Sequence, residues 1–273
     1  MAMSNDSLDI ERLFSLKGKV ALVTGGSRGI GRMISQGLLQ AGARVYISAR
    51  TAEDCEAAAL DLQQYGDCVA ITADVTDPES RSDLYRQLRE SETALNILVN
   101  NAGTAWAESY ESYPESAFDK LMKINVASVF VLTRDLTPLL EAAASKDDPA
   151  RVINIGSMDG LHVPTVTRLG SYAYSASKAA VHQLTKNLAV DLGPRNITVN
   201  AVAPGFFPSK MTVALISQRR EDMEKNSLLR RLGRAEEMAG VAVYLCSRAG
   251  AYTHGAIIPV DGGTSINNQH VMD

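Results

Sequence analysis

Short apolar runs alternate with longer segments of helical pattern along most of this chain. The runs are rich in valine and isoleucine and lack apolar–polar alternation, which is typical of strands covered on both faces. They occupy residues 19–25, 43–50, 68–74, 95–103, 150–157, 197–205 and 256–263. Helical patterns separate them, among others at residues 30–40, 51–64 and 78–89. This alternation predicts an α/β fold, with a doubly wound parallel sheet of about seven strands and helices on both faces.

The pattern continues without an internal repeat, a low-complexity tract or an interdomain linker. A length of 273 residues suits one large domain or two small ones, and either could bury a sizeable core. Because nothing interrupts the alternation, a single domain over residues 1–273 is the better interpretation. Residues 1–16 precede the first predicted strand and are expected to form an N-terminal tail.

A glycine-rich motif, VTGGSRGIGR at residues 23–32, joins the first predicted strand to the first predicted helix. Such a bend lets the backbone approach a pyrophosphate, while the helix N-terminus adds free N–H groups and a positive dipole end. A side chain at Gly25, Gly29 or Gly31 would block that approach. A tight turn with close helix packing is the alternative. The flanking strand and helix favour a dinucleotide-binding, Rossmann-type fold.

The end of the second predicted strand indicates which dinucleotide is bound. Strands at this place usually end in an acid that holds a ribose 2′-hydroxyl, but this one ends in Ala49 and Arg50. Arg28, inside the glycine motif, adds a second cation. Two guanidiniums without a carboxylate favour a 2′-phosphate, so NADP(H) is the expected cofactor. Two solvated surface arginines are the alternative.

Tyr174 and Lys178 stand one helical turn apart in the segment SYAYSASKAAVHQL. Residues four apart on a helix share a face, so both side chains can point into one cleft. A free phenol has a pKa of roughly 10, and a nearby ammonium is expected to lower that pKa toward a range useful for proton transfer. A packed phenol and a surface amine are the alternative. Tyr172 has Ala176 at the matching offset and is interpreted as a wall residue.

The composition indicates which classes of binding partner and which cellular compartment are expected. Lysine and arginine number 27 against 31 acids, a net charge of −4 that argues against a nucleic-acid partner. Three scattered cysteines suggest reduced thiols in the cytoplasm. The polar N-terminus is no signal peptide, and no apolar run approaches the ~20 residues that span a bilayer, so no membrane contact is expected. The four histidines lack metal-ligand spacing, and no metal is expected.

Seven short motifs, taken in order, resemble the short-chain dehydrogenase/reductase family, and in particular the branch of 3-oxoacyl-carrier-protein reductases and related ketoreductases. The motifs span nearly the whole chain: TGGSRGIG from Thr24, NNAG from Asn100, Asn125 in KINVASVF, Ser157 in INIGS, YSASK from Tyr174, VAPG from Val202 and DGG from Asp261. Each motif alone is modest evidence of kinship, but the ordered set is specific.

The resemblance implies four catalytic residues. Ser157 would donate a hydrogen bond to a substrate carbonyl and steady its developing charge. Tyr174 would give the product oxygen a proton. Lys178 would lower the pKa of Tyr174 and hold the nicotinamide ribose. Asn125 would position a water that resupplies protons through Lys178. Each of two residues also has a structural alternative. Ser157 could simply form a turn, and Asn125 could satisfy backbone groups at a helix kink.

The resemblance also implies a set of cofactor contacts along the chain. Arg50 would meet the 2′-phosphate, while Ser209 could replace a threonine that the family carries near the carboxamide. The full expected set is Gly25, Ser27, Arg28, Gly29, Ile30, Gly31, Arg50, Asp74, Val75, Asn101, Ala102, Gly103, Tyr174, Lys178, Pro204, Gly205, Phe207 and Ser209.

Family resemblance further implies an NADPH-dependent reduction of a ketone, with a small carbonyl compound or a 3-oxoacyl thioester as substrate. A nucleotide-sensing regulator or scaffold without turnover is the alternative. Residues 205–234 would form a substrate lid, and the seven cations of this segment could dock an acidic acyl carrier protein or could simply be solvated. A homotetramer is expected by resemblance.

Overall fold

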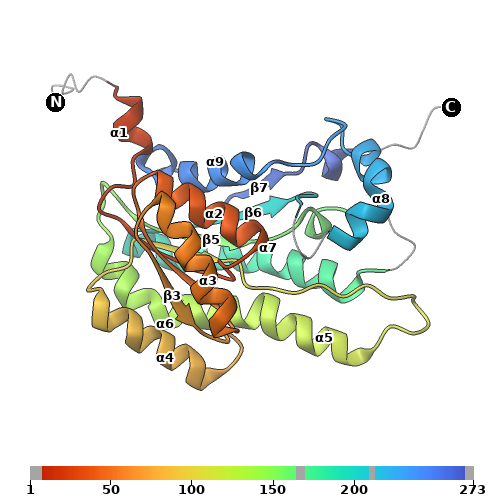
Figure 1. Ribbon diagram of the computed structural model, residues 1–273, viewed down its shortest axis with the longest axis horizontal. Coiled ribbons are helices and arrows are strands. Elements are labelled where there is room, and N and C mark those ends of the chain that lie inside the picture. The colour runs from red at the N-terminus through yellow and green to blue at the C-terminus, as the bar shows by residue number, and fades with distance from the viewer. Residues whose placement is uncertain (1–7, 164–169, 209–212, 268–273) are drawn as a thin grey trace.

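A computed structural model describes residues 8–163, 170–208 and 213–267. All seven of its strands are parallel and form one sheet in the order β3-β2-β1-β4-β5-β6-β7 (Figure 1). The strands are β1 (Val20–Thr24), β2 (Arg44–Ala49), β3 (Cys68–Thr72), β4 (Ile97–Asn100), β5 (Ala150–Ile155), β6 (Ile197–Pro204) and β7 (Ile257–Val260). Each strand falls within one predicted apolar run, so the predicted sheet is confirmed.

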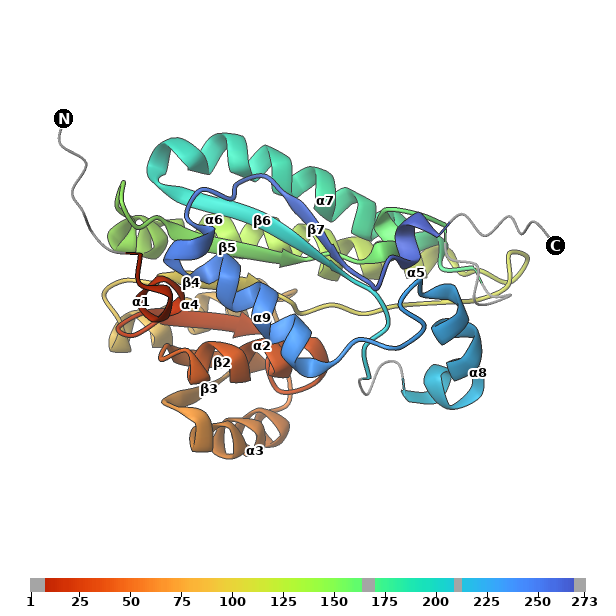
Figure 2. The same cartoon turned by 90° about the horizontal axis from the view of Figure 1, so that it is seen from above.

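Helices cover both faces of the sheet, as Figure 2 shows from above. Along the chain they are α1 (Ile10–Phe14), α2 (Gly29–Gln40), α3 (Ala52–Leu62), α4 (Pro78–Ser91), α5 (Glu115–Met122), α6 (Ser128–Ala143), α7 (Tyr172–Leu192), α8 (Val213–Asn226) and α9 (Ala235–Cys246). Helices α2, α3 and α9 contribute to one buried apolar cluster, and α4, α6 and α7 contribute to the other. Among the residues described, no helix is both long and apolar enough to cross a membrane.

Alternate residues of a strand point to opposite faces, and here both faces are packed. In β1, Ala21 and Val23 belong to the cluster with α2, whereas Leu22 belongs to the cluster with α6. In β2, Ile47 and Tyr46 divide in the same way. A sheet buried on both sides needs continuous apolar strands, which explains why these runs carry no polar alternation.

The chain crosses from strand to helix at one edge of the sheet, where the strands end. Gly25, Arg50, Asn101, Ser157 and Gly205 follow β1, β2, β4, β5 and β6, and all five line one cavity. Clefts at the carboxyl ends of parallel strands are the usual ligand sites of doubly wound folds. The topology therefore places the predicted chemistry at a single place.

Candidate active site

The cavity is lined by most of the residues predicted to bind the cofactor. Those it includes are Gly25, Ser27, Arg28, Gly29, Ile30, Arg50, Asp74, Val75, Asn101, Ala102, Gly103, Tyr174, Lys178, Pro204, Gly205 and Phe207, together with Ser157. Gly31 and Asn125 are not among the residues that line it. Ser209 lies outside the described residues.

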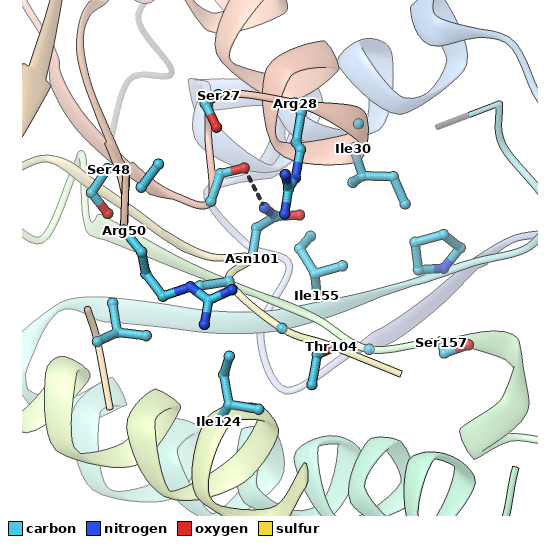
Figure 3. A pocket seen from close by; sticks show the side chains of 18 of the residues that line it. Ser27, Arg28, Ile30, Ser48, Arg50, Asn101, Thr104, Ile124, Ile155 and Ser157 are labelled. Atoms are coloured by element: carbon cyan, nitrogen blue, oxygen red, sulfur yellow. Dashed lines mark hydrogen bonds between the residues drawn. The ribbon is translucent and has the colours of Figure 1, made fainter. Parts of the chain in front are cut away.

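The glycine motif is held against the end of β4 by Asn101. Its side-chain amide donates to the carbonyl oxygens of Thr24 at 2.8 Å and Gly25 at 3.1 Å. Figure 3 draws the Asn101 side chain with a hydrogen bond as a dashed line. Gly25 has φ of +65°, a left-handed conformation that favours glycine. A Cβ on Gly31 would lie 2.3 Å from the Gly25 carbonyl oxygen, so the start of α2 packs directly beneath the loop. Gly31 thus supports the loop and leaves its surface free for a ligand.

Arg28 and Arg50 both extend into the cavity at its nucleotide end (Figure 3). Neither forms an ion pair with any residue the structure describes. Ser48, the last but one residue of β2, also lines this end, and its buried hydroxyl has no hydrogen-bond partner within the described ranges. Two unpaired cations and an unsatisfied hydroxyl make this end complementary to an anion.

Asp74 lines the same end of the cavity, after β3. Its carboxylate accepts hydrogen bonds from the Thr76 backbone N–H and hydroxyl, at 2.8 and 2.7 Å. Burial pushes the pKa of Asp74 upward, but these bonds and the charges of Arg50 and Lys123 outweigh burial and lower the pKa. Asp74 is therefore fixed as a charged acceptor, suited to a hydrogen-bond donor such as an amine on a heterocycle.

Ser157, Tyr174 and Lys178 come together at the other end of the cavity. Ser157 follows β5 in extended conformation, and its Oγ accepts the Asp159 backbone N–H at 3.1 Å. Tyr174 and Lys178 lie on the first two turns of α7, with Lys178 Nζ 5.6 Å from the centroid of the tyrosine ring. Lys178 Nζ also donates to the Ile155 carbonyl at 2.7 Å. The spacing of four residues does place both side chains at one cleft.

The pKa of Tyr174 differs from the sequence prediction. Burial raises it to about 12, the charge of Asp159 adds to that rise, and a hydrogen bond with Ser157 opposes it. Burial likewise lowers the pKa of Lys178 to about 8, which Asp159 opposes. The expected lowering of the phenol pKa by Lys178 is therefore wrong for the chain by itself, because burial disfavours both charged forms.

Asn125 lies within a π-helical turn, Lys123–Ala127, that links α5 to α6. Its side chain pairs with the backbone of Thr104 twice, at 3.0 Å each, and donates to Ser177 Oγ at 2.9 Å. These bonds fit the structural alternative, in which the amide satisfies backbone groups at a helix kink. A role for Asn125 in proton resupply stays a prediction.

Sequence reasoning missed two residues of this region, Ser48 and Asp159. Ser48 is an ordinary strand residue in the sequence, and only the burial of its hydroxyl in the cavity marks it. Asp159 stands in the turn Met158–Gly160 after Ser157, and burial raises the pKa of its carboxyl. A Cβ on Gly160 would lie 2.7 Å from the Lys178 carbonyl carbon, so this turn rests on α7. That contact brings the charge of Asp159 to the tyrosine and the lysine.

In the segment 205–234, predicted to be a substrate lid, Lys210 lies outside the described residues, and four of the other cations are paired with acids. Arg219, Arg220, Arg231 and Arg234 each form an ion pair, with Asp222, Glu224, Glu237 and Glu236 respectively. In the same segment, Phe206 and Ile216 pack on Met223 and Leu232 in an apolar cluster. In the described ranges, no three histidine, cysteine, aspartate or glutamate side chains are grouped as metal ligands would be.

Comparison with known proteins agrees with this geometry. Residues 25–265 match the family described as enoyl-(acyl carrier protein) reductase. The chain is similar to the rhamnolipids biosynthesis 3-oxoacyl-(acyl-carrier-protein) reductase of Pseudomonas aeruginosa, at 51% identity over 254 residues, 92% of this chain and 97% of that protein.

Two solved structures extend the comparison. The Pseudomonas aeruginosa RhlG/NADP active-site complex superposes with a TM-score of 0.89 at 50% identity, covering 93% of this chain and 99% of that one. A gluconate 5-dehydrogenase from Burkholderia cenocepacia in complex with NADP and tartrate gives a TM-score of 0.85 at 28% identity, over 94% of this chain and 99% of that one. The ordered motifs, the parallel sheet and these matches agree: the chain belongs to the short-chain dehydrogenase/reductase family.

Proposed function

We propose that this chain catalyses the NADPH-dependent reduction of a ketone, either a 3-oxoacyl thioester or another carbonyl compound, to a secondary alcohol. One observation carries the proposal. Ser157, Tyr174 and Lys178 converge at one end of a cavity whose other end presents the unpaired Arg28 and Arg50. The similar Pseudomonas aeruginosa proteins, a 3-oxoacyl-(acyl-carrier-protein) reductase and an NADP complex, support both the reaction class and the cofactor.

The residues present fit NADP(H). The loop around Gly25 leaves a backbone surface for a pyrophosphate beside the start of α2. Arg28, Arg50 and the unsatisfied hydroxyl of Ser48 would hold the 2′-phosphate, and Asp74 would accept from the adenine amine. Lys178 would hold the nicotinamide ribose. When bound, NADPH supplies the hydride for the reduction.

Ser157 and Tyr174 would act on the substrate oxygen. Ser157 Oγ accepts the Asp159 N–H, and its hydroxyl hydrogen-bonds with Tyr174. That hydroxyl would turn to donate to a substrate carbonyl when a ketone binds between the two side chains. Since burial raises the pKa of Tyr174 to about 12, the phenol is protonated at neutral pH, the state that a proton donor requires. The phenol proton is therefore available to the substrate oxygen during reduction.

Lys178 would stabilise the phenolate that remains after proton transfer. Its pKa of about 8 leaves most of the ammonium charged at neutral pH. One of its three N–H donors goes to Ile155, and a Cβ on Gly103 would lie 3.8 Å from Nζ, so the ammonium also borders the cavity wall from β4. Lys178 Nζ lies 5.6 Å from the centroid of the Tyr174 ring, and from there its charge would stabilise the phenolate.

The test of the function is a kinetic comparison of substrates and cofactors. Absorbance of the reduced nicotinamide is followed with 3-oxoacyl thioesters, carrier-bound and carrier-free, and with small ketones, each with NADPH and NADH. Saturable turnover with NADPH supports the proposal. Saturable NADPH binding without turnover of any ketone would instead support a sensor or scaffold. A preference for carrier-bound thioesters would favour carrier docking despite the internal pairing of the lid cations.

Arg50→Ala is expected to weaken NADPH binding by about 10-fold or more, the loss of one charged hydrogen bond of ~1.5–3 kcal/mol. NADH binding should change little, because NADH carries no 2′-phosphate. The measurement is cofactor affinity by quenching of protein fluorescence. Arg44, an exposed arginine at the opposite end of β2, provides the control Arg44→Ala. Equal weakening of NADH and NADPH would show that Arg50 does not read the phosphate.

Asp159→Asn is expected to shift the pH profile of the reverse reaction, alcohol oxidation. Oxidation needs Tyr174 ionised, and the charge of Asp159 raises the pKa of that phenol. Removing the charge lowers the pKa, so the rising limb of kcat/KM should move to lower pH. Asp147→Asn, at the exposed loop before β5 and the far end of the sheet, is the control and should leave the profile in place. An unmoved limb in Asp159→Asn would exclude this electrostatic coupling.

We also propose a homotetramer in the cytoplasm. Exposed apolar side chains on α5 and α6, namely Phe118, Met122 and Phe130 at about two-fifths exposure, support burial against other subunits. Light scattering should then give four times the chain mass of 29.3 kDa. A monomer mass at micromolar concentration would refute the assembly and leave the reaction untouched.

A further inference from the structure

The first turn of α7 carries the tyrosine proposed to transfer the proton. With Ser171 as the N-cap, Tyr172, Ala173 and Tyr174 are its first three residues. The N–H groups of a first turn have no partner within the helix, and a side chain at the N-cap usually accepts one of them. Ser171 does not do so, because its Oγ lies 2.9 Å from Ser175 Oγ and accepts no backbone N–H of this turn.

The missing acceptor comes from another part of the chain. Tyr113, in the loop between β4 and α5, accepts the Ala173 N–H with its hydroxyl oxygen at 3.1 Å. Ala173 is the second residue of the helix, the position whose N–H an N-cap serine or aspartate would normally bind. Ala173 itself is fully buried, so water has no access to replace this bond. A residue 60 positions earlier therefore caps α7.

Two further contacts fasten this loop to the start of α7. Glu108 and Gly170 exchange two backbone hydrogen bonds, at 3.2 and 2.9 Å, directly before the helix. The rings of Tyr113 and Tyr172 pack edge to face at 5.2 Å between centroids. The Tyr113 ring also packs edge to face on Phe118 of α5, at 5.7 Å between centroids. The phenol oxygen of Tyr113 is thereby held in place over the helix end.

We propose that Tyr113 is a positioning residue, which caps α7 from outside the helix and so fixes the backbone that carries Tyr174. This inference rests on the proposed reductase function. The same loop contains Thr104, which lines the cavity and is bound by Asn125. The loop between β4 and α5 thus forms part of the cavity wall and also carries the residue that caps α7. The hydroxyl of Tyr113 therefore couples the position of this loop to the first turn of α7.

Tyr113→Phe tests the proposal, since it removes the acceptor and keeps the ring contacts. We expect kcat for ketone reduction to fall about 10-fold, because the turn that carries Tyr174 loses the acceptor that fixes it, with NADPH affinity unchanged. We also expect faster hydrogen–deuterium exchange at the amides of residues 172–174 in the protein without cofactor. Exchange does not depend on turnover, so it reports the cap even if the reductase function fails.

Two controls make the outcome decisive. Tyr110→Phe removes the hydroxyl of an exposed tyrosine of the same ring cluster, one whose oxygen caps no helix, and should change neither kcat nor exchange. Ser171→Ala should leave exchange at Ala173 unchanged, because Ser171 is the N-cap by position alone. Unaltered exchange at residues 172–174 in Tyr113→Phe would overturn the inference, as would faster exchange in Ser171→Ala alone. Absence of turnover in the wild type would refute the proposed function. The hydrogen–deuterium exchange data would still decide whether Tyr113 caps α7.

Discussion

Tyr174→Phe is expected to lower kcat for ketone reduction by roughly 10²–10⁴-fold, the contribution typical of a positioned proton donor. The substitution removes only the hydroxyl, so the ring keeps its place beside Ser157 and Lys178 at the end of the cavity. The substrate oxygen then gains charge with no acid in reach. Because the nucleotide end of the cavity is untouched, NADPH affinity should stay within about twofold of the wild type.

The measurement is kcat and cofactor affinity on the same preparations, with Tyr172→Phe as the matched control. Tyr172 is a phenol two residues earlier in the same helical turn, but its side chain is 44% exposed and packs on Tyr110 and Tyr113. Its loss of a hydroxyl should leave turnover nearly intact. Comparable turnover in Tyr174→Phe and the wild type would show that this tyrosine does not donate the proton.

The fold could be predicted from the sequence because its strands are buried on both faces. Every predicted run contains a strand, and the helix α4, Pro78–Ser91, begins at the predicted residue because Asp77 caps it and Pro78 suits the first position. Hydrophobic periodicity predicted the ends of the helices less well than their existence, as the helix predicted at residues 51–64 shows. The third helix stops at Leu62, and residues 63–65 tighten into a 3₁₀ turn before Gly66.

The chemistry of the site was less predictable than its location. The spacing of Tyr174 and Lys178 indicates that they share a cleft, but the pKa of each depends on how deeply the fold buries it. Asp159 affects both residues only because its turn rests on α7. The cap from Tyr113 joins residues 60 positions apart and leaves no local pattern. These features follow from packing, which motif spacing does not encode.

Gly31→Ala, in the Rossmann-type glycine loop, is expected to lower both the stability of the protein and its affinity for NADPH. The added methyl would lie 2.3 Å from the Gly25 carbonyl oxygen and 2.4 Å from the Asn101 amide nitrogen, so backbone has to move. Overpacking of this kind costs about 1–3 kcal/mol of unfolding free energy. Displacing the loop would also cost two backbone contacts to the pyrophosphate, at ~1.5 kcal/mol each, and weaken NADPH binding about 100-fold.

Gly240→Ala is the matched control, because the chain offers a helical glycine with open space around it. Apart from its two neighbours in the chain and the backbone of α9, no heavy atom of a described residue lies within 4 Å of a Cβ at Gly240. Alanine there should stabilise the helix by about 0.5–1 kcal/mol. Chemical denaturation and NADPH titration of both variants give the two readouts. NADPH affinity in Gly31→Ala equal to that of Gly240→Ala would mean that the loop tolerates the methyl, and that the close approach of Gly31 and Gly25 does not shape the phosphate site.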